Sequence, residues 1–503
     1  MLTGLFTGKN GTTINIKLPL ELRMIKNYLS EEEVSAYLVG GYIRDTLLQR
    51  DAFDIDIAVA TDALSLAREI TEILKGKYIL LDQENNIARV VFYQQDKQYY
   101  LDISALRGDI ERDLSLRDFT IDAIAIAINK LQETIPPEDI IDPFQGRDDI
   151  KNKIIRAVSK NSFQDDPIRM LRAVRLAAEL GFSIEQNTES LITEQHHLLV
   201  NVAMERINEE LCRLFSLPGT SCWLRTLDRM HLLGILIPEL DQTKGIAQPR
   251  EHYWDVYNHL IETVAAVELV FAPDITRYEN NNPGNYLPLS EELQQYFAQH
   301  IGRGLCRKDL MKIAALLHDI AKPQDKIITE SGRTRFFGHD KDSAGIAAQI
   351  LTRLRFSNRQ INTVQKIIEL HMRVGQMAQP GEMPTHRAIY RFFRDAGDVA
   401  IDTLFFSLAD HLAARGPNLD SQHWIEHTNM VRYILSVRQE KKEVIQPPKL
   451  LDGYDLMNIF GLQPGPEIKK ALETIREMQA MGEITTREEA LVAVRKIVML
   501  NED

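Results

Sequence analysis

The sequence predicts a multidomain protein with a small α/β unit near its amino-terminal end and helical domains after it. Strand-like and helix-like patterns alternate from about Leu20 to Ile128, whereas strand patterns largely disappear after Pro143. The length of 503 residues corresponds to three or four folding units of about 150 residues each. We therefore expect an α/β head, a helical neck, a larger helical domain and a short helical tail, over residues 20–145, 146–244, 245–445 and 446–503.

The composition is that of an ordinary globular protein and excludes several classes. Hydrophobic residues make up 44% and charged residues 26% of the chain, which excludes a disordered or fibrous protein. The net charge of −13 means that any contact with nucleic acid needs a local basic patch. No pair among the 3 cysteines has CxxC spacing, so neither a disulfide framework nor a thiolate zinc site is expected.

Targeting and membrane signals are absent from the sequence pattern. The first residues lack a basic segment followed by an apolar run, so they do not resemble a signal peptide. No segment approaches ~18 uninterrupted apolar residues, the length that a membrane-spanning helix needs. We therefore expect a soluble cytoplasmic protein without a membrane partner.

In the α/β head, short apolar runs and periodic segments follow one another closely. Tyr37–Val39 is a strand-like run that Gly40 and Gly41 stop, and 53–60 alternates acidic and apolar residues as a half-buried strand does. The other expected elements are helices at 42–48 and 63–74, the second capped by Thr61 or Asp62, strands at 87–92 and 99–103 with a turn at 94–97, and a strand or helix start at 121–128.

Beyond the head, helical periodicity dominates. The expected helices are 166–180, which Gly181 ends, 190–199 and 203–215. Residues 279–285 are rich in Asn, Pro and Gly and are expected to form a surface loop. Pro447 and Pro448 mark a break before two further helices, which start near Glu467 and Thr486.

The first candidate site combines two glycines, an arginine and two aspartates. Asp54 and Asp56 stand two residues apart on an expected strand, so their side chains point to the same side. Neighbouring carboxylates repel each other unless a divalent cation lies between them, and Mg²⁺ prefers such oxygen ligands. Gly40 and Gly41 stand before an expected helix and leave free backbone N–H groups that attract an anion, and Arg44 adds a positive charge one turn later. The pattern predicts a site for a phosphate group and a metal ion.

Four motifs in this order resemble the class II tRNA nucleotidyltransferases and the related bacterial poly(A) polymerases. They are LVGGYIRD, DIDIAVA, LRDFTIDAIA and DDPIRMLRAVRLAAELGF, and the resemblance covers about residues 20–215. It implies that the head has the fold of the DNA polymerase β-like nucleotidyltransferase superfamily. It also implies an enzyme that transfers nucleotides from nucleoside triphosphates without a nucleic-acid template.

The resemblance carries roles over to individual residues. Asp54 and Asp56 would bind Mg²⁺, and Asp102, in YYLDIS on a neighbouring strand, would be a third catalytic carboxylate. Nucleotide contacts would come from Gly41, Arg44, Arg117 and Asp118. The family usually has a second arginine and an asparagine where this chain has Leu116 and Asp122. Details of ribose and phosphate contact are therefore expected to differ from those of the family.

A basic segment follows the head. Residues 151–175 contain seven Lys or Arg and two Asp, and Asp166, Arg169, Arg172 and Arg175 recur every three residues along one side of an expected helix. Apolar residues on the other sides indicate that this stripe is held against another part of the protein. The resemblance implies that the stripe binds the nucleotide and that Asp166 and Arg169 pair with its base. One carboxylate and one guanidinium suit the donor and acceptor that cytosine and adenine share, and they exclude uracil and guanine.

A further candidate site consists of histidines and aspartates in the larger helical domain. His259, the pair His318-Asp319 and Asp410 resemble, in this order, the metal ligands of HD-domain phosphohydrolases. His339 and His371 resemble the extra histidines of members that hold two metal ions. These ligands suit Mn²⁺, Fe, Ni²⁺ or Zn²⁺, with Mg²⁺ as an alternative, and the open positions of such an ion activate water. Ordinary packing roles are expected for His196, His197, His231 and His300.

The sequence thus predicts an enzyme that adds C and A, or only the terminal A, to the 3′ end of tRNA from CTP and ATP. Its HD domain is expected to carry a second, metal-dependent phosphohydrolase activity. One alternative is a poly(A) polymerase, which would be expected to have a more basic tail. An alternative from another class is a non-catalytic RNA-binding or regulatory protein, against which the intact Asp54, Asp56, Arg44 and Arg169 argue. The choice between CCA and A addition and the oligomeric state stay open.

Overall fold

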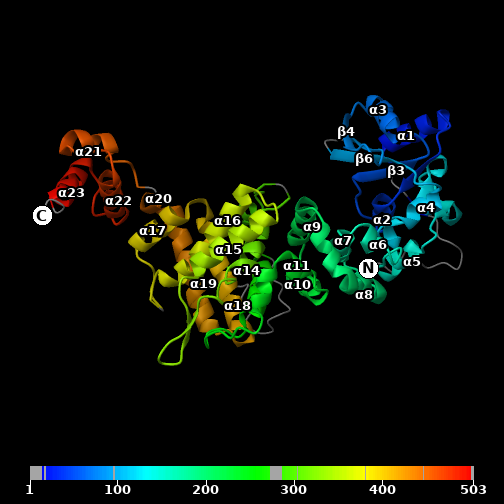
Figure 1. Ribbon diagram of the computed structural model, residues 1–503. Helices are drawn as coiled ribbons and strands as arrows, with labels where there is room; N and C mark the ends of the chain where they lie inside the picture. Colours follow the sequence, from blue (N-terminus) through cyan, green and yellow to red (C-terminus); the bar gives the residue numbers. More distant parts are fainter. Residues whose placement is uncertain are drawn as a thin grey trace. The chain divides into compact units, whose positions relative to one another are not determined.

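The computed structural model describes residues 14–15, 18–94, 97–271, 286–302, 304–379, 381–445 and 447–499. Its contacts divide the chain into two compact units, whose elements are labelled in Figure 1. The first unit comprises Met1–Ala203 and Arg229–Ile235, and the second comprises Met204–Asp228 and Leu236–Asp503. The expected division into four parts stays a prediction. The expected loop at 279–285 lies outside the described residues, as do the two central residues of the expected turn at 94–97.

A 7-stranded mixed sheet with the strand order β4-β5-β6-β3-β2-β7-β9 forms the centre of the first unit. Strand β3 runs parallel to β6 and antiparallel to β2. The strands of this sheet are β2 (Ala36–Val39), β3 (Asp54–Val59), β4 (Lys77–Asp82), β5 (Ile87–Gln94), β6 (Lys97–Ala105), β7 (Ala125–Ala127) and β9 (Ile140–Ile141). Two short pairs stand apart from it, β1 (Ile14–Asn15) with β8 (Thr134–Ile135), and β10 (Ile154–Ile155) with β11 (Ser183–Ile184).

The helices of the first unit leave one face of the sheet to the polar residues of the candidate site. Helices α1 and α3 lie together over one face (Figure 1), and Ile55 and Ile57 of β3 are fully buried. Because side chains alternate along a strand, the aspartates of β3 point to the opposite face. The helices are α1 (Leu20–Glu31), α2 (Gly41–Leu47), α3 (Ala63–Leu74), α4 (Ile110–Ser115), α5 (Gly146–Asn152), α6 (Ser162–Asp165), α7 (Arg169–Leu180) and α8 (Gln186–Gln195).

Helix α3 has the bounds that the sequence predicts. The carboxylate of Asp62 accepts a hydrogen bond from the backbone N–H of Ser65 at 3.2 Å, which makes Asp62 rather than Thr61 the N-cap. Strands β5 and β6 extend the predicted strands by a few residues at their ends. The segment 121–128, for which strand and helix were both expected, is divided between a 3₁₀ turn at Thr120–Asp122 and strand β7.

Two helix starts differ from the prediction, for local reasons. The helix expected from residue 166 begins at Arg169, because Asp166 precedes Pro167 and adopts an extended backbone with φ −151° and ψ 99°. The helix expected at 190–199 is α8, which begins at Gln186 because the side chain of Glu185 caps it through the N–H of Thr188. After Gln195 the chain continues as a 3₁₀ helix, His196–Asn201.

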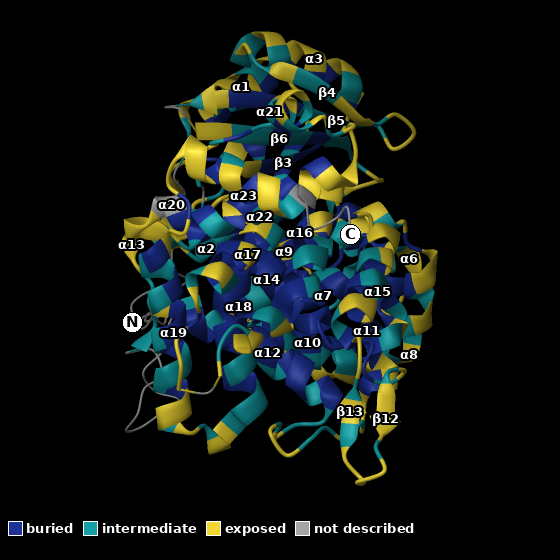
Figure 2. Ribbon diagram, turned by 90° about the vertical axis from the view of Figure 1, so that its left-hand side faces the viewer, coloured by how far each residue is buried: buried dark blue, intermediate teal, exposed yellow. Residues whose placement is uncertain are grey.

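The second unit is almost entirely helical. Its core contains α12, α14, α16 and α18, and most residues of α12, α14 and α18 are buried (Figure 2). A two-stranded hairpin, β12 (Lys326–Ile328) with β13 (Thr334–Phe336), interrupts the helices. The helices are α9 (Met204–Ser216), α10 (Thr220–Arg229), α12 (Val256–Phe271), α13 (Glu291–Phe297), α14 (Arg307–Leu317), α15 (His339–Arg353), α16 (Asn358–Leu370), α17 (His386–Ala396), α18 (Ala400–Arg415), α19 (Ser421–Glu440), α20 (Lys442–Ile445), α21 (Gly453–Phe460), α22 (Pro466–Ala480) and α23 (Arg487–Met499). Helix α11 (Leu232–Leu236) belongs to the first unit except for its last residue.

The carboxy-terminal helices α21, α22 and α23 share a small apolar core of their own, which includes Leu456 and Ile475. Glu477 of α22 joins them to α17 through a bidentate ion pair, in which both of its oxygens lie 2.8 Å from the guanidinium of Arg391. The predicted helix starts near Glu467 and Thr486 agree with α22 and α23 to within one residue. Among the described helices, none combines the length and the apolar character that a membrane crossing requires.

Candidate active sites in the two units

Three carboxylates lie side by side on the polar face of the head sheet. Asp54 and Asp56 are both on β3, and the parallel pairing of β3 with β6 places Asp102 directly opposite Asp56. Paired residues on neighbouring strands point to the same face, so the three aspartates converge. The structure therefore brings together the three residues for which the sequence predicts a metal-binding and catalytic role.

Arg89 of β5 is a member of this group that sequence reasoning missed. It pairs in register with Asp102, and its guanidinium binds both oxygens of that carboxylate, at 2.7 and 2.9 Å. Asp54 and Asp56 also stabilise its charged form, although the bond to Asp102 contributes most to the raised pKa of Arg89. An arginine on an alternating strand gives no sequence signal that distinguishes it from a solvent-facing residue.

Gly40 is required by the close approach of two functional side chains. Its φ of 77° lies in the left-handed region, which favours glycine. A Cβ atom at this position would lie 2.7 Å from Nη1 of Arg117 and 3.1 Å from Oδ2 of Asp56. The next residue, Gly41, is the first of α2, which therefore begins one residue before the predicted helix at 42–48. The glycine pair thus lets the loop before α2 pass directly beside the carboxylates.

Arg44 is buried and its guanidinium is held by two carboxylates. Nη1 donates to Asp122 at 2.6 Å, while Nε and Nη2 donate to the two oxygens of Asp45 at 3.0 Å each. The pKa of Arg44 is raised by Asp122 and Asp45, which outweigh the opposing effect of burial. Contact between Arg44 and a triphosphate stays a prediction, and it requires one of these ion pairs to give way. Asp122, a departure from the family pattern, is therefore the partner that fixes Arg44.

The basic stripe of α7 is held against the motif that contains Arg117 and Asp118. Arg172 pairs with Asp118 at 2.7 Å, and Nη2 of Arg169 donates to the carbonyl of Leu116 at 2.7 Å. Burial would raise the pKa of Asp118, but Arg172 and Arg169 outweigh it and keep this carboxylate ionised. Asp166 lies one turn before Arg169, whose N–H donates to the Asp166 carbonyl at 3.1 Å.

Arg175, the last residue of the stripe, does not face the same way. Its side chain is buried and binds Glu179 of the same helix at 2.7 Å. Because a spacing of three residues falls short of a full helical turn, the stripe rotates around α7 and its end turns toward the interior. The predicted base contact of Asp166 and Arg169 and the nucleotide contacts of Arg172 and Arg175 stay predictions.

Asp56→Asn is expected to stabilise the metal-free protein at neutral pH. Burial raises the pKa of Asp56 from 3.8 to about 6, against the opposing effect of Arg117. The folded state therefore disfavours the ionised carboxylate, and this cost is fully present above the folded pKa and disappears as the pH falls below 3.8. An amide avoids the cost, which for such a shift is on the order of 1–3 kcal/mol.

Thermal melting in EDTA, at about pH 8 and about pH 4, measures this difference. The gain in melting temperature should be present at the higher pH and small at the lower one. Asp102→Asn is the matched control, which should show no gain because it breaks the ion pair with Arg89. Equal melting of wild type and Asp56→Asn at both pH values would contradict a buried charge at this position.

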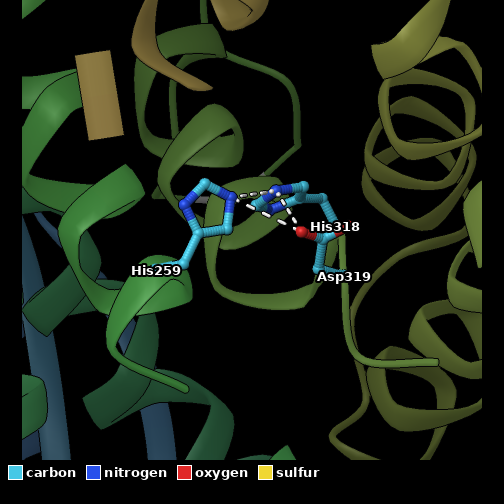
Figure 3. A group of neighbouring side chains, drawn as sticks. All are labelled: His259, His318 and Asp319. Carbon is cyan, nitrogen blue, oxygen red and sulfur yellow. Dashed lines mark hydrogen bonds and ion pairs between the residues drawn. The ribbon is translucent and has the colours of Figure 1, made fainter. Parts of the chain in front are cut away.

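In the second unit, six side chains that the sequence names as metal ligands converge on one point. We call them the HD cluster: His259, His318, Asp319, His339, His371 and Asp410. Nε2 of His259 lies 3.1 Å from Nε2 of His318 and 3.4 Å from Oδ2 of Asp319 (Figure 3). His259 comes from the first turn of α12 and Asp410 from α18, while His318, His339 and His371 stand at helix ends.

Backbone hydrogen bonds orient three of these imidazoles. Nδ1 of His318 lies 2.9 Å from the carbonyl of Ala315, and Nδ1 of His371 lies 2.7 Å from that of Ile368. His339 makes the same contact with Phe336, at 2.7 Å. An Nδ1–H that donates to a carbonyl leaves the lone pair on Nε2, which is the arrangement that metal-binding histidines adopt. Each Nε2 atom faces the carboxylates of the cluster.

Asp319 faces two pairs of histidines with its two oxygens. Oδ2 lies 3.4 and 3.3 Å from Nε2 of His259 and His318, whereas Oδ1 lies 3.3 and 3.8 Å from Nε2 of His339 and His371. Oδ2 also lies 2.5 Å from the ammonium of Lys322, whereas Oδ1 has no hydrogen-bond partner among the described residues, which is costly for a buried carboxylate oxygen unless a cation binds there. Burial would raise the pKa of Asp319, but His318 and Lys322 hold it well below its usual range. His259 and His318 on one side, and His339 and His371 on the other, could each hold a divalent cation together with Asp319.

Sequence reasoning missed two residues beside the HD cluster. Lys322 is buried, and its Nζ lies 2.5 Å from Oδ2 of Asp319 and 2.6 Å from Oε1 of Gln248. His252 stacks edge-on against His259 with 5.2 Å between ring centroids, and burial lowers its pKa to about 3. Lys322 stands three residues after Asp319, and this spacing, which suits an ion pair on a helix, was the signal in the sequence that could have identified it.

Comparisons with known families and proteins agree with this geometry. The model described as "Poly A polymerase head domain" matches residues 36–156, and the model described as "HD domain" matches residues 290–415. Further models, for RNA binding by polymerase A and for tRNA nucleotidyltransferase domain 2, match residues 181–244 and 423–494. The chain thus contains a nucleotidyltransferase head and an HD domain, although the HD match begins after His259.

The relatives extend over nearly the whole chain. A CC-adding tRNA nucleotidyltransferase from Thermus thermophilus is 30% identical over 467 residues, which cover 90% of this chain and 92% of the relative. The chain belongs to the tRNA nucleotidyltransferase family. Another member, an A-adding tRNA nucleotidyltransferase from Deinococcus radiodurans, is 29% identical over 467 residues, with 92% and 95% coverage.

Solved structures support the fold of this tRNA nucleotidyltransferase. A CCA-adding enzyme in complex with CTP superposes with a TM-score of 0.61 at 21% identity, over 95% of this chain and 94% of that one. The Thermotoga maritima CCA-adding enzyme in complex with tRNA gives a TM-score of 0.58 at 22% identity, over 95% and 94% of the two chains. The arrangement of a polymerase β-like head followed by helices is therefore confirmed.

Proposed function

We propose that this enzyme adds C and A to the 3′ end of tRNA, from CTP and ATP and without a nucleic-acid template. The observation that carries the proposal is the convergence of Asp54, Asp56 and Asp102 on one face of the head sheet, beside Gly40 and Gly41. Membership of the tRNA nucleotidyltransferase family, with relatives named for CC and A addition, supports tRNA as the acceptor. A tRNA substrate also supports the expected cytoplasmic location.

The three carboxylates suit an in-line transfer of a nucleotidyl group. Mg²⁺ bound at Asp54 and Asp56 would supply charge for the α-phosphate and lower the pKa of the attacking hydroxyl. The 3′-oxygen of the tRNA forms a bond to the α-phosphorus, the bond to pyrophosphate breaks, and a carboxylate or solvent takes the hydroxyl proton. Gly40 lets Arg117 stand beside Asp56, where its positive charge would face the phosphates. Arg89 holds Asp102 in position.

Arg169→Ala is expected to weaken or abolish the choice of CTP and ATP over UTP and GTP. The guanidinium of Arg169 donates to the carbonyl of Leu116, which fixes its position. The backbone N–H of Arg169 donates to the carbonyl of Asp166, which fixes the positions of the two residues relative to each other. Losing a fixed hydrogen-bond donor to the base should lower discrimination by at least about 10-fold. Incorporation of each radiolabelled triphosphate into tRNA measures this, and Mg²⁺ affinity should be unchanged. Selection at the wild-type level in the variant would place the base-reading group elsewhere.

The tRNA ends that the enzyme can extend distinguish CCA addition, CC addition and A addition. Three tRNAs, which end before the first C, after C and after CC, are incubated separately with each triphosphate and their 3′ ends are sequenced. A CCA-adding enzyme extends all three, a CC-adding enzyme extends only the first two, and an A-adding enzyme extends only the third. Extension of none of them would contradict the proposal and favour a non-catalytic RNA-binding role.

For the second unit, we propose a metal-dependent phosphohydrolase that acts on phosphate esters at damaged tRNA ends. The buried carboxylate of Asp319, which faces both histidine pairs, and the oriented Nε2 atoms support it. Bound Mn²⁺, Ni²⁺, Fe, Zn²⁺ or Mg²⁺ would activate water and polarise the phosphate. In the hydrolysis of a 2′,3′-cyclic phosphate, the oxygen of water bonds to phosphorus, one P–O ester bond breaks, and the released ribose oxygen takes a proton. The head could then rebuild the free 3′ end.

A further inference from the structure

We propose that the hairpin β12–β13 and the adjoining Phe337 form a nucleobase-binding wall beside the HD cluster. This wall makes the site select nucleotides over phosphate esters that lack a base. The inference rests on the proposed phosphohydrolase function and adds its substrate class and the residue that recognises it. Phe337 is the specificity-determining residue.

The pocket at the HD cluster is larger than metal ions and a phosphate group need. Its volume is about 910 Å³, which is near the upper end of the range for small-molecule sites. Asp319, His339, His371 and Asp410 line one part of it, and residues 332–337 line another. A ligand whose phosphate binds at the cluster therefore has room for a ribose and a base toward the hairpin.

The hairpin is joined rigidly to the metal ligands. The carbonyl of Phe336, the last residue of β13, accepts the hydrogen bond from Nδ1 of His339 at 2.7 Å. The Phe336 ring also packs edge-on against the His339 ring, with 6.4 Å between centroids, and Nζ of Lys322 lies 5.4 Å from the Phe336 centroid. Gly338, with φ 81°, makes the turn between the hairpin and α15. Phe337 is thus held two residues from a ligand of the cluster.

The Phe337 ring is exposed to solvent and lies near arginine side chains. Its side chain is 60% exposed although it lines the pocket, and the guanidinium of Arg335 lies 5.9 Å from its ring centroid. Arg250 and Arg333 line the same pocket and have no carboxylate partner among the described residues. Figure 2 shows the hairpin projecting from its helices with most of its residues exposed. Exposed aromatic rings among cations are the elements that bind bases and phosphates of single-stranded nucleic acids.

The test compares a cyclic phosphodiester that has a base with one that lacks it. Wild-type protein with Mn²⁺ or Ni²⁺ is assayed on 2′,3′-cyclic AMP, on an RNA oligonucleotide ending in a 2′,3′-cyclic phosphate, and on glycerol 1,2-cyclic phosphate. Phe337→Ala should raise KM for the adenosine substrate at least about 5-fold, with kcat nearly unchanged, because base stacking is lost. It should leave glycerol cyclic phosphate unaffected. A larger effect on the oligonucleotide than on 2′,3′-cyclic AMP would identify RNA ends as the source.

Two further variants make the test specific. Ile328→Ala is the matched control, since Ile328 is 68% exposed on β12 but does not line the pocket, and it should change neither substrate. Phe337→Trp should restore KM, and its fluorescence should be quenched by 2′-AMP and not by glycerol 2-phosphate, even without metal. If the wild type hydrolyses these substrates, equal effects of Phe337→Ala on both cyclic phosphates, or no effect on either, would overturn the inference. Absence of all hydrolysis in the wild type would instead overturn the phosphohydrolase function itself.

Discussion

Asp54→Ala and Asp56→Ala are each expected to abolish nucleotide addition while the protein stays folded. The two carboxylates stand on one face of β3, and Asp102 lies opposite Asp56 on β6. Removal of a metal-binding carboxylate should cost at least about 10²–10³ in rate, since these residues hold the charge that stabilises the transferring phosphate. The fold should persist because the other face of β3, with Ile55 and Ile57, forms the core.

Incorporation of radiolabelled ATP and CTP into tRNA, together with thermal melting, measures both effects. Asp51→Ala is the matched control, since Asp51 is an exposed residue of the same segment and its one ion pair among the described residues is a surface contact of 3.9 Å with Lys97. It should keep near-wild-type incorporation. A folded Asp56→Ala protein with normal incorporation would exclude the assignment of the metal site.

Asp319→Ala is expected to abolish phosphohydrolase turnover and to leave nucleotide addition unchanged. Asp319 is the residue that faces both histidine pairs of the HD cluster, so its loss removes a ligand from each cation position. The head has its own core in the first unit, and the cluster lies wholly in the second. Turnover is measured on 2′,3′-cyclic AMP and 2′-AMP with Ni²⁺, Mn²⁺ or Mg²⁺.

Loss of Asp319 also leaves the buried ammonium of Lys322 without its closest partner, which costs stability. Asp319→Asn, which keeps the volume, therefore accompanies the alanine variant, and melting is recorded for both. His300→Ala is the control, because His300 is exposed and stands outside the cluster. Undiminished hydrolysis by a folded Asp319→Asn protein would contradict the role of the HD cluster, and loss of nucleotide addition would contradict separable activities.

Residue type and order predicted the members of the sites better than the contacts that those residues make. The HD cluster could be named because its histidines and aspartates resemble, in order, the metal ligands of HD-domain phosphohydrolases, although they come from elements as distant as α12 and α18. Asp54 and Asp56 could be placed together because alternation along a strand fixes the face of each side chain, whereas Asp102 was named from the family resemblance.

Ion pairing was the part that the sequence did not predict. Nothing in the sequence pattern indicates that Asp45 and Asp122 hold Arg44, or that Arg89 holds Asp102, because these partners meet only after the sheet has formed. Helix starts were missed for a related reason. Pro167 forces Asp166 into an extended backbone, so α7 begins at Arg169 and not at Asp166. The predicted helical stripe of charges therefore begins at Arg169.

The most direct test of the central claim uses tRNA and an unstructured RNA as competing acceptors. Two forms of a tRNA, one that ends before the first C and one that ends after CC, and an RNA oligonucleotide of unrelated sequence are incubated with the wild-type enzyme, Mg²⁺ and all four triphosphates, and every 3′ end is sequenced. We expect the tRNA to receive only C and A, with addition stopping at or before the complete CCA end, and the oligonucleotide to stay unextended. Long runs of A on both RNAs would identify a poly(A) polymerase, and the absence of any addition would contradict a nucleotidyltransferase built on Asp54 and Asp56.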